Sequence, residues 1–352
     1  MATSPVHCSI DLSAPGKHVG RLELPRSNNT SGWSHQFVQI VSIRGSSAGP
    51  TAVVIGGVHG DEPEGQIAAL RLARETQPDD VTGRLIVVPC ASPDASRAYT
   101  RLWPNGVNFN RSFPGDPDGP ADQQLAHFFS TVLFPLADVV VDMHSGGRSG
   151  LCPPWSEMHW VDDPVQRRAM VDAMLAWGTD HHFVYIDIAG TGLLVGEAER
   201  QGKVVVSTEL GGGGHVTAAT HRIAQSGLAN VLRHVGVLRG EVTTRDAPGI
   251  IGRATDDENY LLAPESGLWE TFVDLGERVA EGQPVGQILF LERPDREPAV
   301  VYARNDGIVF VVRAIATTDQ GDNVAVIARE ATVEELYRPT AAVVTRRRGA
   351  RG

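Results

Sequence analysis

A histidine and a glutamate, His59 and Glu62, stand three positions apart, directly after an apolar run at residues 53–55 and two glycines. An imidazole nitrogen and a carboxylate oxygen both bind zinc, and a rigid turn can direct the two at one ion. Catalytic zinc usually has three protein ligands and an open position for water, so a third ligand is needed. The best candidate is His144, which follows a second apolar run and precedes a glycine turn. We therefore expect His59, Glu62 and His144 to bind one zinc ion per chain, although His59 alone could be a structural turn residue.

Both of these segments have the form of a strand that ends in a turn. Residues 53–55 are bounded by glycines and are too few for a helix, which indicates a buried strand. Pro63 suits the first turn of a following helix, and residues 85–88 form another apolar run. The order strand, helix, strand predicts a parallel pair with a right-handed crossover. The metal ligands would then lie at the carboxyl ends of strands, where open α/β sheets bind their ligands.

A further carboxylate, Glu209, lies near the end of a predicted strand at residues 203–210 and is followed by glycines at 211–214. Zinc lowers the pKa of its bound water toward ~7, and hydrolysis needs a general base beside that water. Glu209 is our candidate for the base, since the glycines leave space for a ligand. A helix-capping or ion-paired carboxylate is the alternative.

The irregular segment 91–118 carries the cationic and amide side chains that a hydrolase would need. Long irregular loops inside compact domains are usually functional. Arg101 or Arg97 could stabilise the oxyanion of a tetrahedral intermediate; we assign this role to Arg101 and keep Arg97 as a substrate-binding candidate. Arg111 with Asn110 could hold a substrate carboxylate, because a guanidinium group binds carboxylates through two hydrogen bonds. For Arg111 a loop-fixing ion pair is the alternative.

Several further polar residues lie near these segments. Asp142 faces the same side of its strand as His144 and could orient an imidazole ligand or be a buried structural aspartate. We interpret His215 as a cap of the helix predicted from about residue 216 to 238. His181 and His182 follow a predicted helix at 165–179, and we expect them at the surface.

Length and patterning predict two domains. The 352 residues exceed what one hydrophobic core usually spans. Beyond residue 245, glycines and prolines separate short apolar runs, which is an all-β pattern. We expect an α/β domain at 1–245 and a β-rich domain at 246–352 with a frayed basic tail. The expected strands of the second domain are 260–262, 268–273, 285–290, 300–303, 308–312 and 324–327.

Charge and cysteine content restrict the partners and the compartment. A net charge of -11 argues against nucleic acid and anionic membranes as partners and is compatible with a cationic substrate. Cys8, Cys90 and Cys152 are widely spaced and form no C-x-x-C motif, so we expect neither a disulfide framework nor a sulfur-rich metal site. No apolar run approaches the ~20 residues of a membrane span, and no signal peptide is evident. We therefore expect a cytoplasmic protein.

Four segments resemble the succinylglutamate desuccinylase/aspartoacylase family, a branch of the zinc carboxypeptidase superfamily. They are HGDE at 59–62, NFNRSFPG at 108–115, DMH at 142–144 and TE at 208–209. The resemblance implies a three-layer α/β/α domain with a mixed central sheet, and a C-terminal β domain. It also implies zinc on the three predicted ligands, Glu209 as general base, Arg101 polarising the scissile carbonyl, and Asn110 with Arg111 on the substrate carboxylate.

Within that family, the chain length and the segments 97–115 and 209–214 look most like the ectoine-utilisation deacetylases. The resemblance implies a zinc-dependent amidohydrolase that converts Nα-acetyl-L-2,4-diaminobutyrate to L-2,4-diaminobutyrate and acetate in ectoine degradation. The alternatives are a desuccinylase- or aspartoacylase-type deacylase, a small carboxypeptidase, and a metal-dependent binding protein without turnover. We expect a small-molecule substrate, and the chain could form a homo-oligomer.

The C-terminal segments 263–267 and 282–286 resemble the hammerhead of biotinyl and lipoyl carriers. A carrier needs a lysine at its hairpin tip, but the lysines of this chain are Lys17 and Lys203, outside this region. We therefore expect a barrel-sandwich-like structural lid or oligomer contact, and not a carrier domain.

Overall fold

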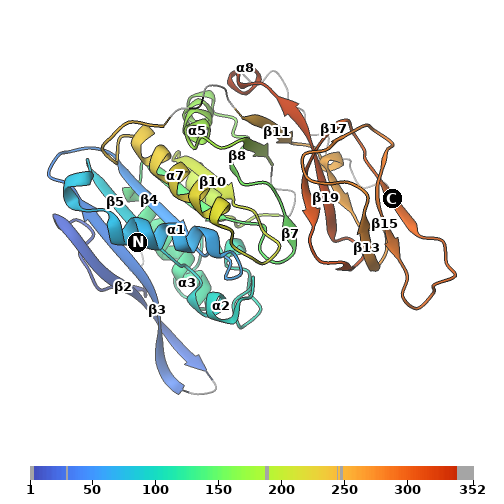
Figure 1. Ribbon diagram of the computed structural model, residues 1–352. Coiled ribbons are helices and arrows are strands. Elements are labelled where there is room, and N and C mark those ends of the chain that lie inside the picture. Colours follow the sequence, from blue (N-terminus) through green and yellow to red (C-terminus); the bar gives the residue numbers. More distant parts are fainter. Residues whose placement is uncertain (1–3, 29–30, 187–189, 244, 246–248, 339–352) are drawn as a thin grey trace.

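The computed structural model describes residues 4–28, 31–186, 190–243, 245 and 249–338, and the predicted basic tail lies outside this part. A large mixed sheet runs through the molecule (Figure 1). Its strands, in spatial order, are β1 (His7–Cys8), β2 (Gly16–Asn28), β3 (Ser31–Arg44), β5 (Arg84–Val88), β4 (Thr51–Gly56), β6 (Val139–His144), β10 (Val204–Glu209), β8 (Trp155–His159), β9 (His181–Tyr185), β11 (Ile250–Ala254), β19 (Asn323–Ala331), β17 (Gly307–Arg313) and β14 (Arg278–Val279). Two further strands, β7 (Gly150–Leu151) and β12 (Tyr260–Leu262), pair with β17 and β19 beside this path.

The centre of the sheet is parallel. β4 pairs with β5 on one side and with β6 on the other, and β6 pairs with β10, all in parallel register. This confirms the parallel pair predicted from the strand, helix, strand order. Because carboxyl ends of parallel strands meet at one edge of a sheet, the residues that follow β4 and end β6 and β10 are brought together there.

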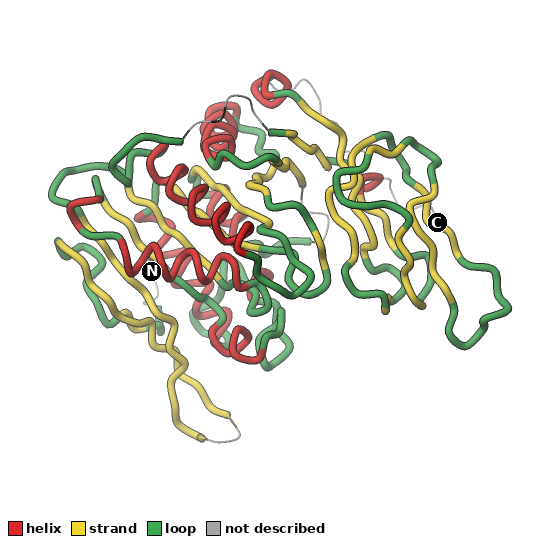
Figure 2. The backbone as a smooth tube through the Cα atoms, in the orientation of Figure 1, coloured by secondary structure: helices red, strands yellow, loops and turns green. Residues whose placement is uncertain are grey.

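Helices cover both faces of this parallel region (Figures 1 and 2). α1 and α7 lie on one face, and α3, α4 and α6 on the other. The helices are α1 (Pro63–Glu75), α2 (Pro93–Ala98), α3 (Ala121–Phe128), α4 (Phe134–Leu136), α5 (Pro164–Ala176), α6 (Leu194–Arg200), α7 (Ala218–His234) and α8 (Val333–Tyr337), with helical turns η1 (Pro78–Asp80), η2 (Phe109–Arg111), η3 (Phe129–Leu133) and η4 (Asp257–Asn259). The predicted three-layer α/β/α arrangement is confirmed.

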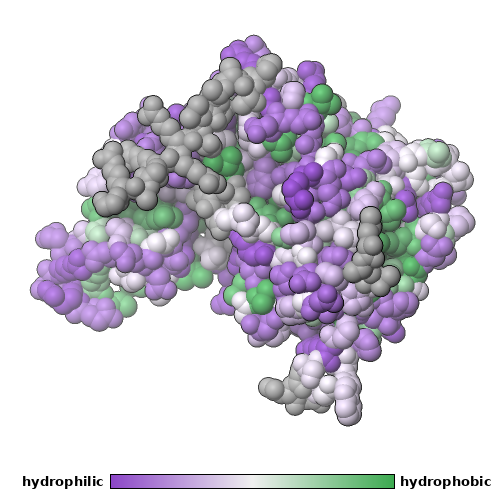
Figure 3. Space-filling view, turned by 180° about the vertical axis from the view of Figure 1, so that it is seen from behind, coloured by the Kyte–Doolittle hydropathy of each residue, from purple (hydrophilic) through white to green (hydrophobic). Residues whose placement is uncertain are grey.

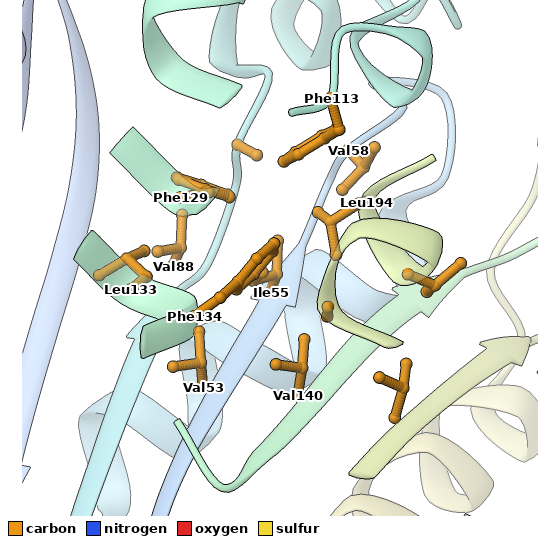
Figure 4. Close-up of a cluster of buried hydrophobic side chains, with 14 of the residues drawn as sticks. Val53, Ile55, Val58, Val88, Phe113, Phe129, Leu133, Phe134, Val140 and Leu194 are labelled. Atoms are coloured by element: carbon orange, nitrogen blue, oxygen red, sulfur yellow. The ribbon is translucent and has the colours of Figure 1, made fainter. Parts of the chain in front are cut away.

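The alternation of side chains along β4 shows why helices cover both faces of the sheet. Val53 and Ile55 pack against Phe129 and Phe134 on one face, as Figure 4 shows. Val54 points to the opposite face, into the cluster beneath α1 and α7. Successive side chains of a strand point to opposite faces, so an uninterrupted apolar run is buried only between two helical layers.

A smaller sheet of four antiparallel strands follows in the C-terminal part. Its order is β16 (Ala299–Tyr302), β15 (Pro284–Leu289), β13 (Gly267–Thr271) and β18 (Thr317–Thr318). All six strands expected beyond residue 245 are confirmed, with ends shifted by a few residues. β11 and β19 belong to the large sheet, however, since β11 pairs with both β9 and β19. The division of the chain at residue 245 stays a prediction.

The prediction for His181 and His182 was wrong. Both lie in β9, between β8 and β11, and His182 is buried. These strands are five residues each and mix polar with apolar side chains, most of them buried, so they lack a simple apolar period. Only the pairing of segments distant in sequence makes them strands.

A long antiparallel hairpin, β2–β3, projects from the body of the molecule (Figures 1 and 3). Trp33, near the end of the hairpin, is 98% exposed. None of the helices in the described part is both long and apolar enough to span a bilayer.

Candidate active site

His59, Glu62 and His144 converge at the carboxyl edge of the central strands. The carboxylate of Glu62 lies between the imidazoles, with Oε1 2.8 Å from Nδ1 of His59 and Oε2 2.8 Å from Nδ1 of His144. The ring centroids are 4.9 Å apart, and the three ligand atoms lie within 4.8 Å of one another. Bonds of about 2 Å to one ion require such spacing. The structure thus brings together the three side chains predicted to bind zinc.

The outer nitrogen of each imidazole has its own hydrogen-bond acceptor. Nε2 of His144 lies 2.9 Å from Oδ2 of Asp142, and Nε2 of His59 lies 3.1 Å from Oδ1 of Asn108. Each Nε2 can donate to its acceptor, and in the neutral tautomer this leaves the lone pair on Nδ1, facing Glu62. Such outer acceptors fix the tautomer and orientation of a metal-binding histidine.

The pKa values of the three side chains are shifted in different directions. Burial raises the pKa of Glu62, but the two imidazoles outweigh burial and hold that pKa well below its ordinary value. Burial lowers the pKa of His144, but the carboxylates of Asp142 and Glu62 outweigh it and raise the pKa well above its ordinary value. The pKa of His59 is lowered, because burial exceeds the attraction of Glu62 alone. The neighbouring carboxylates thus favour the charged form of His144 and not that of His59.

Close backbone approaches hold the ligands in place. A Cβ added to Gly65, in the first turn of α1, would lie 2.5 Å from the carbonyl oxygen of Met143, so α1 begins directly against the end of β6. The amide of His144 donates to Oγ1 of Thr208, and this hydroxyl lies 3.1 Å from the carbonyl oxygen of His144. Glycine is required where a helix and a strand approach so closely.

Glu209 ends β10 directly beside the metal centre. Its backbone pairs in register with His144 in β6 and with Trp155 in β8. Oε2 of Glu209 is buried and has no hydrogen-bond partner in the described part of the chain. Burial, followed by repulsion from Glu62 and Glu157, raises the pKa of Glu209 well above its ordinary value. The carboxyl is thus available for proton transfer.

A cavity of about 670 Å³ opens beside these groups. Arg101, Ser145, Glu209 and Glu157 line it on the side of the central sheet, and Tyr260 is one of several lining residues from the C-terminal part. A cavity of this size accommodates a small metabolite. The C-terminal strands thus supply one wall of the cavity, and the role of this part as a lid or an oligomer contact stays a prediction.

Of the four loop residues predicted to act on substrate, Arg101 reaches the site. Its Nη1 donates to Oε1 of Glu62 at 2.8 Å, and its side chain is 43% exposed. Asn110 accepts from the amide of Leu194 through Oδ1, and Nη1 of Arg111 donates to the carbonyl of Asn110. Both lie in η2, beyond the lining of the cavity. Their role on a substrate carboxylate stays a prediction.

Arg97 lies elsewhere. Its side chain is 71% exposed and forms an ion pair with Asp94, and it does not line the cavity. Arg97 ends α2, the short helix before the loop, so its side chain follows the helix surface. The structure does not bring Arg97 to the other site residues.

The role expected for His215 was wrong. α7 begins with the capping box of Thr217 and Thr220, while Nδ1 of His215 lies 3.3 Å from the carbonyl of Gly213. The sequence signal for this N-cap is a threonine three positions before another polar residue, which is a common capping pattern. Sequence reasoning also missed Asn108 as the partner of His59 and Glu157 as a cavity residue.

Comparisons with known proteins agree with this site. The sequence model of the succinylglutamate desuccinylase/aspartoacylase catalytic domain matches residues 48–235, which include the site residues named above except Tyr260. The N-alpha-acetyl-L-2,4-diaminobutyric acid deacetylase of Halomonas elongata is 37% identical over 334 residues, 95% of this chain and 97% of that protein.

Two solved structures are similar over the whole fold. A succinylglutamate desuccinylase/aspartoacylase from Rhodobacter sphaeroides is 38% identical, with a TM-score of 0.88, and the match covers 94% of this chain and 100% of that one. The product-bound ectoine utilization protein EutE (DoeB) from Ruegeria pomeroyi is 37% identical, with the same TM-score and coverage of 94% and 100%. Site geometry, sequence and fold agree, and the chain belongs to the succinylglutamate desuccinylase/aspartoacylase family.

Proposed function

We propose that this protein is a zinc-dependent amidohydrolase that removes acetate from Nα-acetyl-L-2,4-diaminobutyrate in the degradation of ectoine. The observation that carries the proposal is the convergence of His59, Glu62 and His144 beside Glu209 in one cavity. The choice of substrate is supported by the Halomonas deacetylase, and the metabolic context by the name of the Ruegeria protein.

The three ligands fit a zinc ion. Two imidazole nitrogens and one carboxylate oxygen form a mixed donor set that catalytic zinc adopts. With Nε2 of each histidine beside its own acceptor, both Nδ1 atoms face the oxygens of Glu62. When these Nδ1 atoms are deprotonated, their lone pairs and the carboxylate repel one another unless a cation lies between them. A divalent ion bound there would polarise the scissile carbonyl and acidify a water molecule.

The roles of the chain's own residues follow from their positions. Glu209 takes a proton from the attacking water and returns it to the amine nitrogen as the amide bond breaks. Burial raises the pKa of this carboxyl well above its ordinary value, which favours its acting as both acceptor and donor of the proton. Arg101, partly exposed at the cavity, donates to the carbonyl oxygen as negative charge develops there.

The test is a panel of substrates offered to the zinc-loaded protein, with free amine and acetate measured separately. We expect release from Nα-acetyl-L-2,4-diaminobutyrate and much slower release from N-acetylaspartate, N-succinylglutamate and dipeptides. Preference for one of the latter would instead support a desuccinylase- or aspartoacylase-type deacylase or a carboxypeptidase. Tight zinc binding without any turnover would support a binding protein.

The setting of the enzyme completes the proposal. We propose a cytoplasmic location, which the absence of paired cysteine spacings supports, with Cys8, Cys90 and Cys152 all free. We also propose a homo-oligomer. The exposed Trp33 on a projecting hairpin supports this, because a large aromatic side chain is seldom left in water.

A further inference from the structure

Glu157, in β8, is a buried carboxylate that the roles described above do not use. It is 5% exposed and lines the same cavity as Glu209. Nε1 of Trp155 donates to its Oε2 at 2.8 Å, which fixes the direction of the side chain. Glu157 forms no ion pair within the described part of the chain. Leaving a buried carboxylate without a cation is costly, so such a group is a candidate for binding a cationic ligand.

The arginines of the cavity are engaged elsewhere. Arg313 forms an ion pair with Asp322 at 2.9 Å, and Arg101 forms one with Glu62 at 2.8 Å. Among the described residues that line the cavity, Glu157 and Glu209 thus lack a cationic partner. Glu209 is assigned to proton transfer, which leaves Glu157 as the unmatched carboxyl group.

The register of the sheet sets the distance between the two carboxylates. Glu209 pairs with Trp155 across β10 and β8, and Ser207 pairs with Glu157. Glu209 and Glu157 are therefore diagonal neighbours on one face, with Cα atoms about 7–8 Å apart. In an N-acylated diaminobutyrate the terminal amine is four bonds from the amide nitrogen, or ~5 Å when extended. An amide held at Glu209 would place that amine within reach of Glu157.

Aromatic side chains surround Glu157. Phe183 lies opposite it in β9, 5.0 Å from the ring of Trp155 and 5.7 Å from the ring of Tyr185, measured between centroids. Aromatic faces attract an ammonium group. Burial, followed by repulsion from Glu157 and other carboxylates, raises the pKa of Tyr185 well above its ordinary value, so Tyr185 adds no charge. An acidic and aromatic recess favours an ammonium group and repels a carboxylate.

We propose that Glu157 binds the ammonium group of the substrate's side chain and so selects cationic N-acyl amino acids over neutral and anionic ones. This inference rests on the proposed function, because it specifies which side chain the deacylase accepts. Glu157 is a specificity residue and takes no part in breaking the amide bond.

The test compares Nα-acetyl-L-2,4-diaminobutyrate with Nα-acetyl-L-norvaline, in which a methyl group replaces the ammonium group. For the wild-type protein we expect the ratio of the two kcat/KM values to favour the cationic compound by at least ~100-fold. In Glu157→Gln, which keeps an oxygen for Trp155, the ratio should fall by about 100-fold. The matched control is Glu199→Gln, since Glu199 is another carboxylate with little exposure, bonded to His159 and outside the cavity. This variant should keep the wild-type ratio.

The outcomes separate the inference from the proposed function. If the wild-type protein is active and the ratio of its two kcat/KM values is near one, the inference is wrong while the proposed function stands. No variant is needed for this outcome. Equal losses on both compounds in Glu157→Gln would show that Glu157 only supports the fold, and would also overturn it. A wild-type protein that releases acetate from neither compound would overturn the proposed function together with the inference.

Discussion

Glu209 and His144 lie directly opposite each other at the ends of two parallel strands. They form the last of six consecutive pairs between β10 and β6, which begin with Val204 opposite Val139. Because side chains alternate along a strand, a shift of one residue would turn the carboxyl of Glu209 to the other face of the sheet. Backbone pairing therefore fixes the proposed general base beside a proposed metal ligand.

Replacement of Glu209 by Gln should abolish most turnover and leave zinc bound. An amide cannot take the proton of the attacking water, and positioned general bases contribute roughly 10²–10⁴-fold. We expect kcat to fall by about 10³-fold with unchanged zinc content, measured by acetate release and elemental analysis. A loss of less than tenfold would remove Glu209 from the proposed mechanism.

Removal of zinc by a chelator should abolish activity, and added zinc should restore it. A ligand that binds only the folded state at 100 times its Kd stabilises that state by about 2.7 kcal/mol. The melting temperature of the apo protein should therefore rise with zinc. His144→Ala should show no such rise, and a full zinc response in this variant would contradict the ligand set.

Asp142→Asn should weaken zinc binding without removing a ligand. Oδ2 of Asp142 accepts from Nε2 of His144, and loss of such an outer partner typically costs 10–100-fold in metal affinity. Competition with a chelator measures this change. Asp138→Asn is the control, because Asp138 lies at the opposite end of β6 and accepts from the amide of Thr51. Equal losses in both variants would argue against an orienting role.

Arg101→Met should lower kcat by about 10²-fold and change KM less, since the guanidinium is proposed to act on charge that develops in the transition state. Steady-state kinetics of acetate release measure both constants. Arg97→Ala should cost much less, because its side chain is exposed and paired with Asp94. A larger loss for Arg97 than for Arg101 would reverse the assignment of the two arginines.

His182 should make stability depend on pH below neutrality. Burial, with repulsion from His181 and Arg245, lowers its pKa from 6.5 to about 4, although Asp180 opposes the shift. Asp172 and His234 line the cavity beside it. Above pH 6.5 His182 is neutral in both states. Between pH 6.5 and 4 the unfolded chain binds the proton more readily, so the free energy of unfolding should fall by roughly 3 kcal/mol.

Urea unfolding of the wild type and of His182→Gln at pH 7 and pH 4.5 measures this loss. The variant can still bond to Ser156, the partner of Nδ1 of His182, but does not titrate. Its stability should therefore fall less than that of the wild type over the same pH range. Parallel falls would show that other groups cause the pH dependence.

The metal ligands could be predicted from sequence because each stands next to an uninterrupted apolar run and a glycine. In a parallel sheet such a run is a strand that is buried on both faces, and the carboxyl ends of these strands meet at one edge of the sheet. Glu157 could not be predicted in this way. It lies in a short strand with mixed polarity, and it faces the cavity only because β8 pairs with β10 and β9, which are distant in the sequence.

Arg97 and Arg101 show a second limit of prediction from the sequence. Arg97 and Arg101 are four positions apart, and nothing in their spacing distinguishes them. α2 ends between the two, and Tyr99 takes a left-handed conformation at φ 53° that turns the chain away from the helix axis. Arg101 thus reaches Glu62 while Arg97 remains on the helix surface.

The large sheet does not stop where the helical layers end. β9 continues through β11 to β19, and β19 and its neighbour β12 carry two residues that line the cavity, Val326 and Tyr260. A protein shortened to end at residue 245 would expose the edge of β9 to solvent and lose one side of its substrate chamber. The C-terminal part therefore completes both the large sheet and the cavity.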